Sequence, residues 1–113
     1  ENRRILIDTG PQARRKWLLS ALAARDLAPG DIDTVVLTHL HWDHCQNTDL
    51  FTKARMLVHP HELDYAKNPN QADWNSETYF VDMLAKLKVE PISEGDSIAA
   101  GVSIIDTPGH TRG

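Results

Sequence analysis

Three histidines and one aspartate lie in the six-residue stretch from His39 to His44. Neutral imidazole and carboxylate are the groups through which proteins bind zinc, iron and manganese. His39 and His41 are separated by one residue, so both side chains can turn toward one point. Asp43 and His44 follow one step on and can face a second point beside the first. This density of ligand groups on a single loop is hard to explain without a metal ion, so the stretch predicts a metal site.

An apolar run, Thr34–Leu37, comes directly before the histidines, and its β-branched residues predict a buried strand that ends where a loop begins at Thr38. Near the start of the chain, Ile5–Ile7 predicts a second strand that ends in the sharp turn Asp8–Pro11. Between the two strands, Gln12–Arg25 predicts a helix whose apolar side chains recur at helical spacing: Trp17, Leu18, Ala21 and Leu22. The order of strand, helix and strand favours an α/β layer arrangement.

The second half of the chain predicts a series of shorter elements. In order, these are a helical turn over Asn47–Phe51, a strand over Ala54–Val58, a helix from Pro60 through Ala66, a polar loop over Lys67–Asn75, a helix over Glu77–Lys88, short strands within Glu90–Gly101 and a strand over Val102–Ile105. The second helix carries a stripe that is typical of core packing: Phe80, Val81, Leu84 and Leu87. After the last strand, Thr107-Pro108-Gly109-His110 forms another strand-end loop that carries a histidine.

Other residues could bind a metal, but simpler roles are favoured for them. His59 and His61 have a ligand-like spacing, yet no carboxylate-histidine pair accompanies them, which favours a surface or helix-start role. Cys45 follows the histidine stretch directly and could act as a thiolate ligand. A small buried residue that packs behind the loop is the favoured interpretation, because one cysteine without a partner seldom makes a site.

The composition is that of an ordinary globular domain. The chain has 113 residues, of which 41% are hydrophobic and 25% charged, and its net charge is -4. This mild acidity argues against binding of nucleic acid through a broad basic surface. One cysteine cannot form an internal disulfide, which fits a reducing compartment, and the sequence shows no signal peptide and no membrane-spanning run. These features predict a soluble, cytoplasmic protein with no membrane association.

Taken together, the motifs resemble the metallo-β-lactamase superfamily. The resemblance is carried by the stretch from His39 to His44, by the earlier segment Ile5–Gly10 and by the later segment Thr107–His110, in the order found in that family. It implies the α/β (α+β) class and a four-layer αββα sandwich with a metal site at one edge of its two sheets. Residues 1–113 would form part of one such domain, its N-terminal half.

The length of the chain departs from the family pattern. A complete member has a strand pair before the Asp-Thr-Gly segment and a second half after the position of His110. That second half normally supplies a bridging carboxylate and a last histidine for the second metal ion. The sequence is therefore expected to be a fragment of a longer protein.

The resemblance also implies which residues bind metal. Two divalent ions would take two sets of ligands: His39, His41 and His110 for the first, and Asp43 and His44 for the second. Zinc is the first expectation for both ions, with iron, manganese or cobalt as alternatives. Asp8 would lie near the site without binding metal itself. A histidine at the second position of the motif, where redox di-iron relatives usually have glutamate, favours hydrolysis over electron transfer.

Within the superfamily, the motif most resembles that of the N-acyl homoserine lactonases and related lactone hydrolases. This implies a quorum-quenching type of enzyme that hydrolyses a small ester or lactone through a metal-bound hydroxide, with Asp43 orienting the nucleophile or taking up its proton. Two departures, Cys45-Gln46-Asn47 after the motif and Arg112 where proline is common, leave the substrate open. The alternatives are a phosphodiesterase or nuclease, a thioester hydrolase, or a non-catalytic metal-binding module that forms a homodimer through an exposed sheet face.

Overall fold

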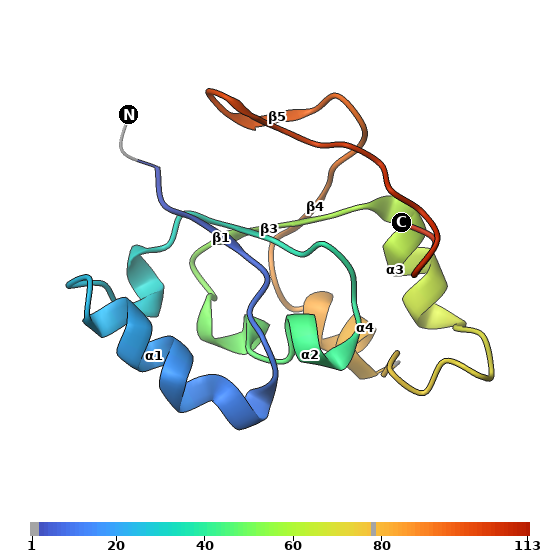
Figure 1. Cartoon of the computed structure of the whole chain (residues 1–113), viewed down its shortest axis with the longest axis horizontal. Coiled ribbons are helices and arrows are strands. Elements are labelled where there is room, and N and C mark those ends of the chain that lie inside the picture. The colour runs from blue at the N-terminus through green and yellow to red at the C-terminus, as the bar shows by residue number, and fades with distance from the viewer. Residues whose placement is uncertain (1–2, 78) are drawn as a thin grey trace.

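The computed structural model describes residues 3–77 and 79–113, which fold around a parallel β-sheet (Figure 1). Its four strands lie in the order of the chain: β1 (Ile5–Ile7), β2 (Thr34–Val36), β3 (Arg55–Val58) and β4 (Val89–Pro91). Ile7 pairs with Val36, which in turn pairs with Leu57. Because parallel strands bring their carboxyl ends to the same edge of a sheet, the loops that follow β1, β2 and β3 meet at that edge.

Helices cover one face of this sheet, and a hairpin lies over the other face (Figure 1). The helices are α1 (Arg15–Ala23), α2 (Trp42–Cys45), α3 (Pro60–Lys67) and α4 (Tyr79–Leu84), and α3 follows β3 at the edge where the strands end. Short 3-10 turns span Gln12–Arg14, Pro29–Asp31 and Thr48–Leu50. The hairpin consists of the antiparallel strands β5 (Ser97–Ala99) and β6 (Val102–Ser103). A layer of helices, a parallel sheet and a second, two-stranded sheet follow one another.

Two apolar clusters hold these layers together. The cluster between the sheet and the helices includes four side chains that are at most 1% exposed: Val35, Phe51, Met56 and Leu84. The cluster between the sheet and the hairpin contains Val36, Leu57, Ile92 and Ile98. Neighbouring residues of a strand point to opposite faces, so Val35 and Val36 belong to different clusters. A strand that is buried on both faces reads as a continuous apolar run, which is why β2 could be predicted.

The predicted strands β1, β2 and β3 and the predicted start of α3 are confirmed, but α1 differs from its prediction. A 3-10 turn replaces its first residues, and the helix ends at Ala23. Trp17, which was expected on the apolar face, is 67% exposed, and the guanidinium of Arg14 lies 4.1 Å from its ring centroid. Leu18 and Leu22 pack against the core, and Trp17 precedes Leu18 by one residue, which places it about 100° away around the helix.

The C-terminal elements are also shorter than predicted. α4 ends at Leu84, and the chain then turns into β4. The carbonyl of Lys88, directly before β4, accepts a hydrogen bond of 2.9 Å from the N–H of Met56. Residue 78 of the predicted helix lies outside the described residues. The strand predicted over Val102–Ile105 ends at Ser103. Within the described part of the chain, none of the helices has the length and apolar character needed to cross a membrane.

Candidate metal centre

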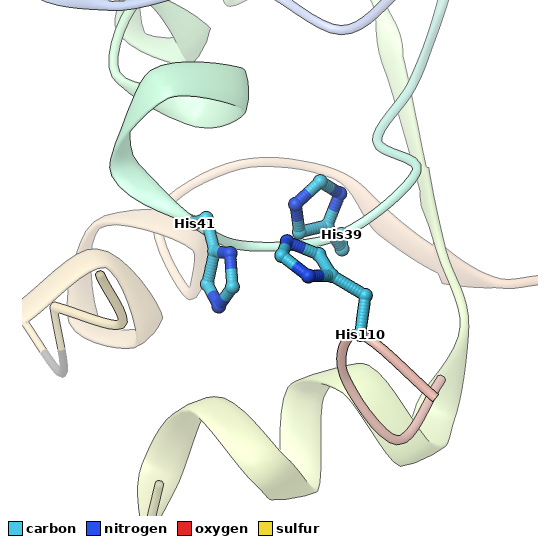
Figure 2. A group of neighbouring side chains, drawn as sticks. All are labelled: His39, His41 and His110. Carbon is cyan, nitrogen blue, oxygen red and sulfur yellow. The ribbon is translucent and has the colours of Figure 1, made fainter. Parts of the chain in front are cut away.

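Three histidine side chains from two separate loops converge at the edge where the strands end (Figure 2). His39 and His41 lie after β2, and His110 lies after β6. Their ligand atoms all lie within 4.8 Å of one another. His41 is buried, His39 is half-buried and His110 is exposed, so the group is reachable from solvent on one side. Three imidazoles in this arrangement could hold a metal ion.

The hydrogen bonds of His39 leave one of its nitrogens free. The hydroxyl of Thr38 donates its single hydrogen to Asp8 Oδ2 at 2.8 Å, so its oxygen can accept from Nδ1–H of His39, which lies 3.0 Å away. His39 Nε2 is then a bare acceptor, and it is buried without a hydrogen-bond partner among the described residues. Burial and the neighbouring His44 and His41 lower the pKa of His39 to about 4. A neutral, desolvated imidazole with an unpartnered nitrogen fits a metal ligand.

A partly buried carboxylate, that of Asp73, fixes the ring of His41. Its Nε2 lies 3.0 Å from Oδ2 of Asp73, so Nδ1 is the nitrogen that remains for a metal. Oδ2 of Asp73 also accepts hydrogen bonds from the hydroxyls of Tyr65, at 2.8 Å, and Ser76, at 2.9 Å. Burial alone would raise the pKa of Asp73, but these hydrogen bonds outweigh it and hold that pKa well below its usual range. The carboxylate therefore stays charged beside His41.

Asp43 and His44 lie beside the three-histidine group without belonging to it. The His44 ring centroid lies 4.1 Å from that of His39, and His44 Nε2 is 3.6 Å from Oδ2 of Asp43. The other nitrogen of His44, Nδ1, lies 2.7 Å from Oδ2 of Asp8, which also accepts from Thr38. Because a carboxylate accepts hydrogen bonds only, His44 keeps its hydrogen on Nδ1 and exposes Nε2. The exposed Nε2 of His44 and the carboxylate of Asp43 therefore lie near each other, next to the three-histidine group.

Asp8 has an unusual backbone conformation. Its φ angle is 54°, in the left-handed region that non-glycine residues seldom adopt. This conformation directs its carboxylate across the end of β2, where Oδ1 accepts the N–H of Thr38 at 2.8 Å. Such local strain is typical of functional sites, where the surrounding contacts compensate for it. The contacts of Asp8 with Thr38 and His44 place it directly behind the histidine stretch.

The stretch after His41 was expected to be a loop, but it contains the short helix α2, Trp42–Cys45. The N–H of His44 donates to the carbonyl of His41 at 3.0 Å, which starts this helical turn. The indole N–H of Trp42 donates to Asn75 Oδ1 at 3.1 Å and ties α2 to the loop that carries Asp73.

Comparison with known proteins agrees with this geometry. The family profile described as "Metallo-beta-lactamase superfamily" matches residues 1–113. The chain belongs to this superfamily. Its predicted fold class and its predicted membership are thereby confirmed, and the metal-site geometry described above belongs to a metallo-β-lactamase fold.

The relatives include metallo-hydrolases and lactonases. A Methanocaldococcus jannaschii protein named as a metallo-hydrolase is 32% identical over 109 residues, which cover 96% of this chain and 43% of that protein. An N-acyl homoserine lactonase of Rhizobium rhizogenes is 41% identical over 56 residues, which cover 50% of this chain and 20% of the relative. A solved N-acyl homoserine lactone hydrolase with the product N-hexanoyl-L-homoserine bound at its catalytic metal centre has a TM-score of 0.77 at 23% identity, over 96% of this chain and 50% of that chain. This last likeness concerns the fold alone. The chain spans about half the length of these relatives or less.

In this metallo-β-lactamase domain, Asn47 connects the turn after β1 to the end of the histidine stretch. Asn47 is completely buried, and its amide nitrogen donates to the carbonyls of Thr9 at 2.9 Å, Gly10 at 3.1 Å and Pro11 at 3.0 Å. Its Oδ1 accepts a hydrogen bond of 2.9 Å from Nε of Arg15 at the start of α1. No sequence pattern pointed to this role, since Asn47 was predicted only as the first residue of a helical turn.

Glu62 connects α3 to both histidine-bearing loops. It is 1% exposed, and its Oε1 accepts the N–H of Leu40, between the two motif histidines, at 2.8 Å. Its Oε2 accepts the N–H of Gly113 at 3.3 Å. The backbone of Gly113 approaches α3 so closely that a Cβ at that position would clash with the backbone nitrogen of Glu62. One buried carboxylate therefore holds the two loops of the metal centre in relation to each other.

The simpler roles favoured for the remaining candidates are confirmed. His59 is the residue before α3, and its Nδ1 accepts the N–H of His61 at 3.2 Å, which is a helix-start contact. Cys45 is completely buried, and its thiol can donate its one hydrogen to the carbonyl of His41, 3.3 Å from the sulfur, or to that of Leu40, 3.6 Å away. Burial raises the pKa of Cys45 to about 12, with the carboxylate of Glu77 contributing, so this cysteine remains a thiol and does not act as a thiolate ligand.

Cys45 is accordingly expected to resist alkylation in the folded protein. Its sulfur is excluded from solvent and protonated at neutral pH, and alkylating reagents attack exposed thiolates. Treatment with iodoacetamide, followed by mass spectrometry of the peptide that contains Cys45, measures this. Modification should appear only after addition of denaturant, and rapid modification of the native protein would contradict the burial.

Proposed function

We propose that this chain contributes the metal-binding half of a hydrolase that acts on a small ester or lactone. The observation that carries the proposal is the convergence of three histidines at one point, beside which His44 Nε2 lies 3.6 Å from Oδ2 of Asp43. The lactonases among its relatives support the choice of an acyl-lactone as substrate. Residues 1–113 would then be part of one catalytic domain.

The ligand assignment follows from the nitrogens that remain free. His39 Nε2, His41 Nδ1 and the ring of His110 would hold one zinc ion, and Asp43 with His44 Nε2 would hold a second. Zinc bound there would lower the pKa of a coordinated water to about 7 and would polarise a carbonyl oxygen. The carboxylate of Asp43 is 48% exposed, so it can also orient the attacking water or accept its proton. Neutral His39 brings no positive charge to oppose metal binding.

Substrate and metal dependence can be tested together on the whole protein. Its kcat/KM would be measured with an N-acyl homoserine lactone, an acyl thioester and a phosphodiester, before and after treatment with a chelator. We expect the lactone to be hydrolysed fastest, with activity lost on metal removal and restored by added zinc. A preference for the phosphodiester or thioester would overturn the substrate class, and activity that survives complete metal removal would overturn the mechanism.

A further inference from the structure

Asp73 is the most heavily hydrogen-bonded carboxylate near the metal centre, although it lies in a loop with no recognisable motif. Its Oδ2 contacts Tyr65 Oη, Ser76 Oγ and His41 Nε2 at distances between 2.8 and 3.0 Å. Its Oδ1 accepts the N–H of Asn75 at 3.1 Å. The side chains of His41 and Asp73 are only 5% and 13% exposed, so the contact between them is shielded from water.

The loop that carries Asp73 is attached to the histidine stretch by the backbone as well. His41 and Ser76 form an isolated antiparallel bridge, and the N–H of Trp42 donates to the carbonyl of Asn75 at 3.1 Å. From the other side, Tyr65 on α3 donates its hydroxyl to the carboxylate. The position of Asp73 relative to His41 is therefore set by contacts on two sides and does not depend on their mutual attraction alone.

The chemistry of this contact decides which nitrogen of His41 carries the proton. An ionised carboxylate accepts hydrogen bonds only, so His41 must donate its Nε2–H to Asp73. Nδ1 then carries a lone pair, and the ring faces His39 and His110 (Figure 2). Without the carboxylate, a neutral imidazole could place its hydrogen on either nitrogen, and the form with Nδ1–H cannot bind a metal through Nδ1.

We propose that Asp73 is a positioning residue, which holds His41 in the tautomer and orientation needed to bind a metal through Nδ1. The proposal rests on the proposed function, since it takes His41 as a metal ligand. Tyr65 and Ser76 act on His41 only indirectly, because their hydroxyls orient the carboxylate of Asp73 but do not contact the imidazole. Loss of a hydrogen-bond partner of a ligand histidine typically weakens metal binding by about 10- to 100-fold.

The decisive variant is Asp73→Asn. Asparagine has nearly the same shape, but its NH2 group can donate to Nε2 and so favour the tautomer that carries hydrogen on Nδ1. Tyr65→Phe and Ser76→Ala are matched controls, because each removes one hydrogen bond to the same carboxylate and leaves its contact with His41 in place. His41→Ala, which removes the proposed ligand itself, measures how much zinc binding depends on this histidine.

Two measurements on the whole protein test the inference. Competition with a chromogenic chelator gives the zinc affinity, and nitrogen-15 NMR of the metal-free protein gives the tautomer of His41. We expect Asp73→Asn to bind zinc about 10- to 100-fold more weakly and to shift hydrogen toward Nδ1. The two hydroxyl variants should keep the wild-type tautomer and lose less affinity. In the wild type, which needs no variant to fold, hydrogen should reside on Nε2, and a hydrogen on Nδ1 would overturn the inference.

The two proposals can fail separately. If His41→Ala weakens zinc binding while Asp73→Asn has the wild-type affinity and tautomer, the role of Asp73 is overturned and the metal site stands. If His41→Ala binds zinc as tightly as the wild type, the ligand assignment under the proposed function is overturned, whatever the tautomer of His41.

Discussion

Replacing His39 with alanine in the whole protein is expected to remove zinc from the three-histidine centre and to lower lactone turnover by roughly a thousandfold or more. A catalytic metal contributes several kcal/mol to the transition state, and about 1.4 kcal/mol corresponds to a tenfold change in rate. His39 presents a buried Nε2 that has no hydrogen-bond partner in the described part of the chain, and alanine has no atom that could replace it. Elemental analysis and kcat/KM measured on the same preparation check the two effects.

His61→Ala is the matched control for this prediction. His61 is also a histidine, but it is exposed on α3 and its contacts are those of a helix start. Its replacement should leave both the zinc content and the turnover at the wild-type level. Wild-type zinc content together with wild-type turnover in His39→Ala would contradict the assignment of His39 as a ligand.

The second large effect is a loss of folding stability, which is expected when Asn47 is replaced with alanine. The buried amide of Asn47 shares its two hydrogens among the carbonyls of Thr9, Gly10 and Pro11. Alanine would leave these carbonyls without their donor, and each buried polar group left unsatisfied costs about 1–3 kcal/mol. We therefore expect the free energy of unfolding to fall by about 3–5 kcal/mol, allowing for partial rescue by water. Denaturant titration of the whole protein, followed by circular dichroism, measures this loss.

Two further variants sharpen the test of Asn47. Asn47→Asp keeps the shape of the side chain but points a carboxylate at three carbonyl oxygens, so it should destabilise at least as much as alanine. Asn68→Ala is the control, since Asn68 is exposed at the end of α3 and its loss should cost little. An Asn47→Ala protein that unfolds at the same denaturant concentration as Asn68→Ala would show that these hydrogen bonds do not support the fold.

Local sequence patterns account for the elements that were predicted well. A strand buried on both faces requires a continuous apolar run, and Thr34–Val36 has one. Proline at the first helical position marks the start of α3, as predicted. Trp17 was misplaced because helical spacing shows which residues share a face but not which face meets the core.

The sequence by itself predicted the superfamily, the strands that lead to the site and the density of imidazoles from His39 to His44, because strand burial and ligand spacing are local properties. Local spacing could not connect His110 with this group; the family resemblance implied the connection, and the tertiary structure brings the ligand atoms of the three histidines within 4.8 Å of one another. Only the tertiary structure decided that Asp73 contacts His41 and that Glu62 and Asn47 hold the surrounding loops. These contacts join residues that are between 22 and 71 positions apart. Whether such residues meet depends on how the layers pack, so an aspartate in a polar loop or a glutamate on a helix carries no local sign of its partner.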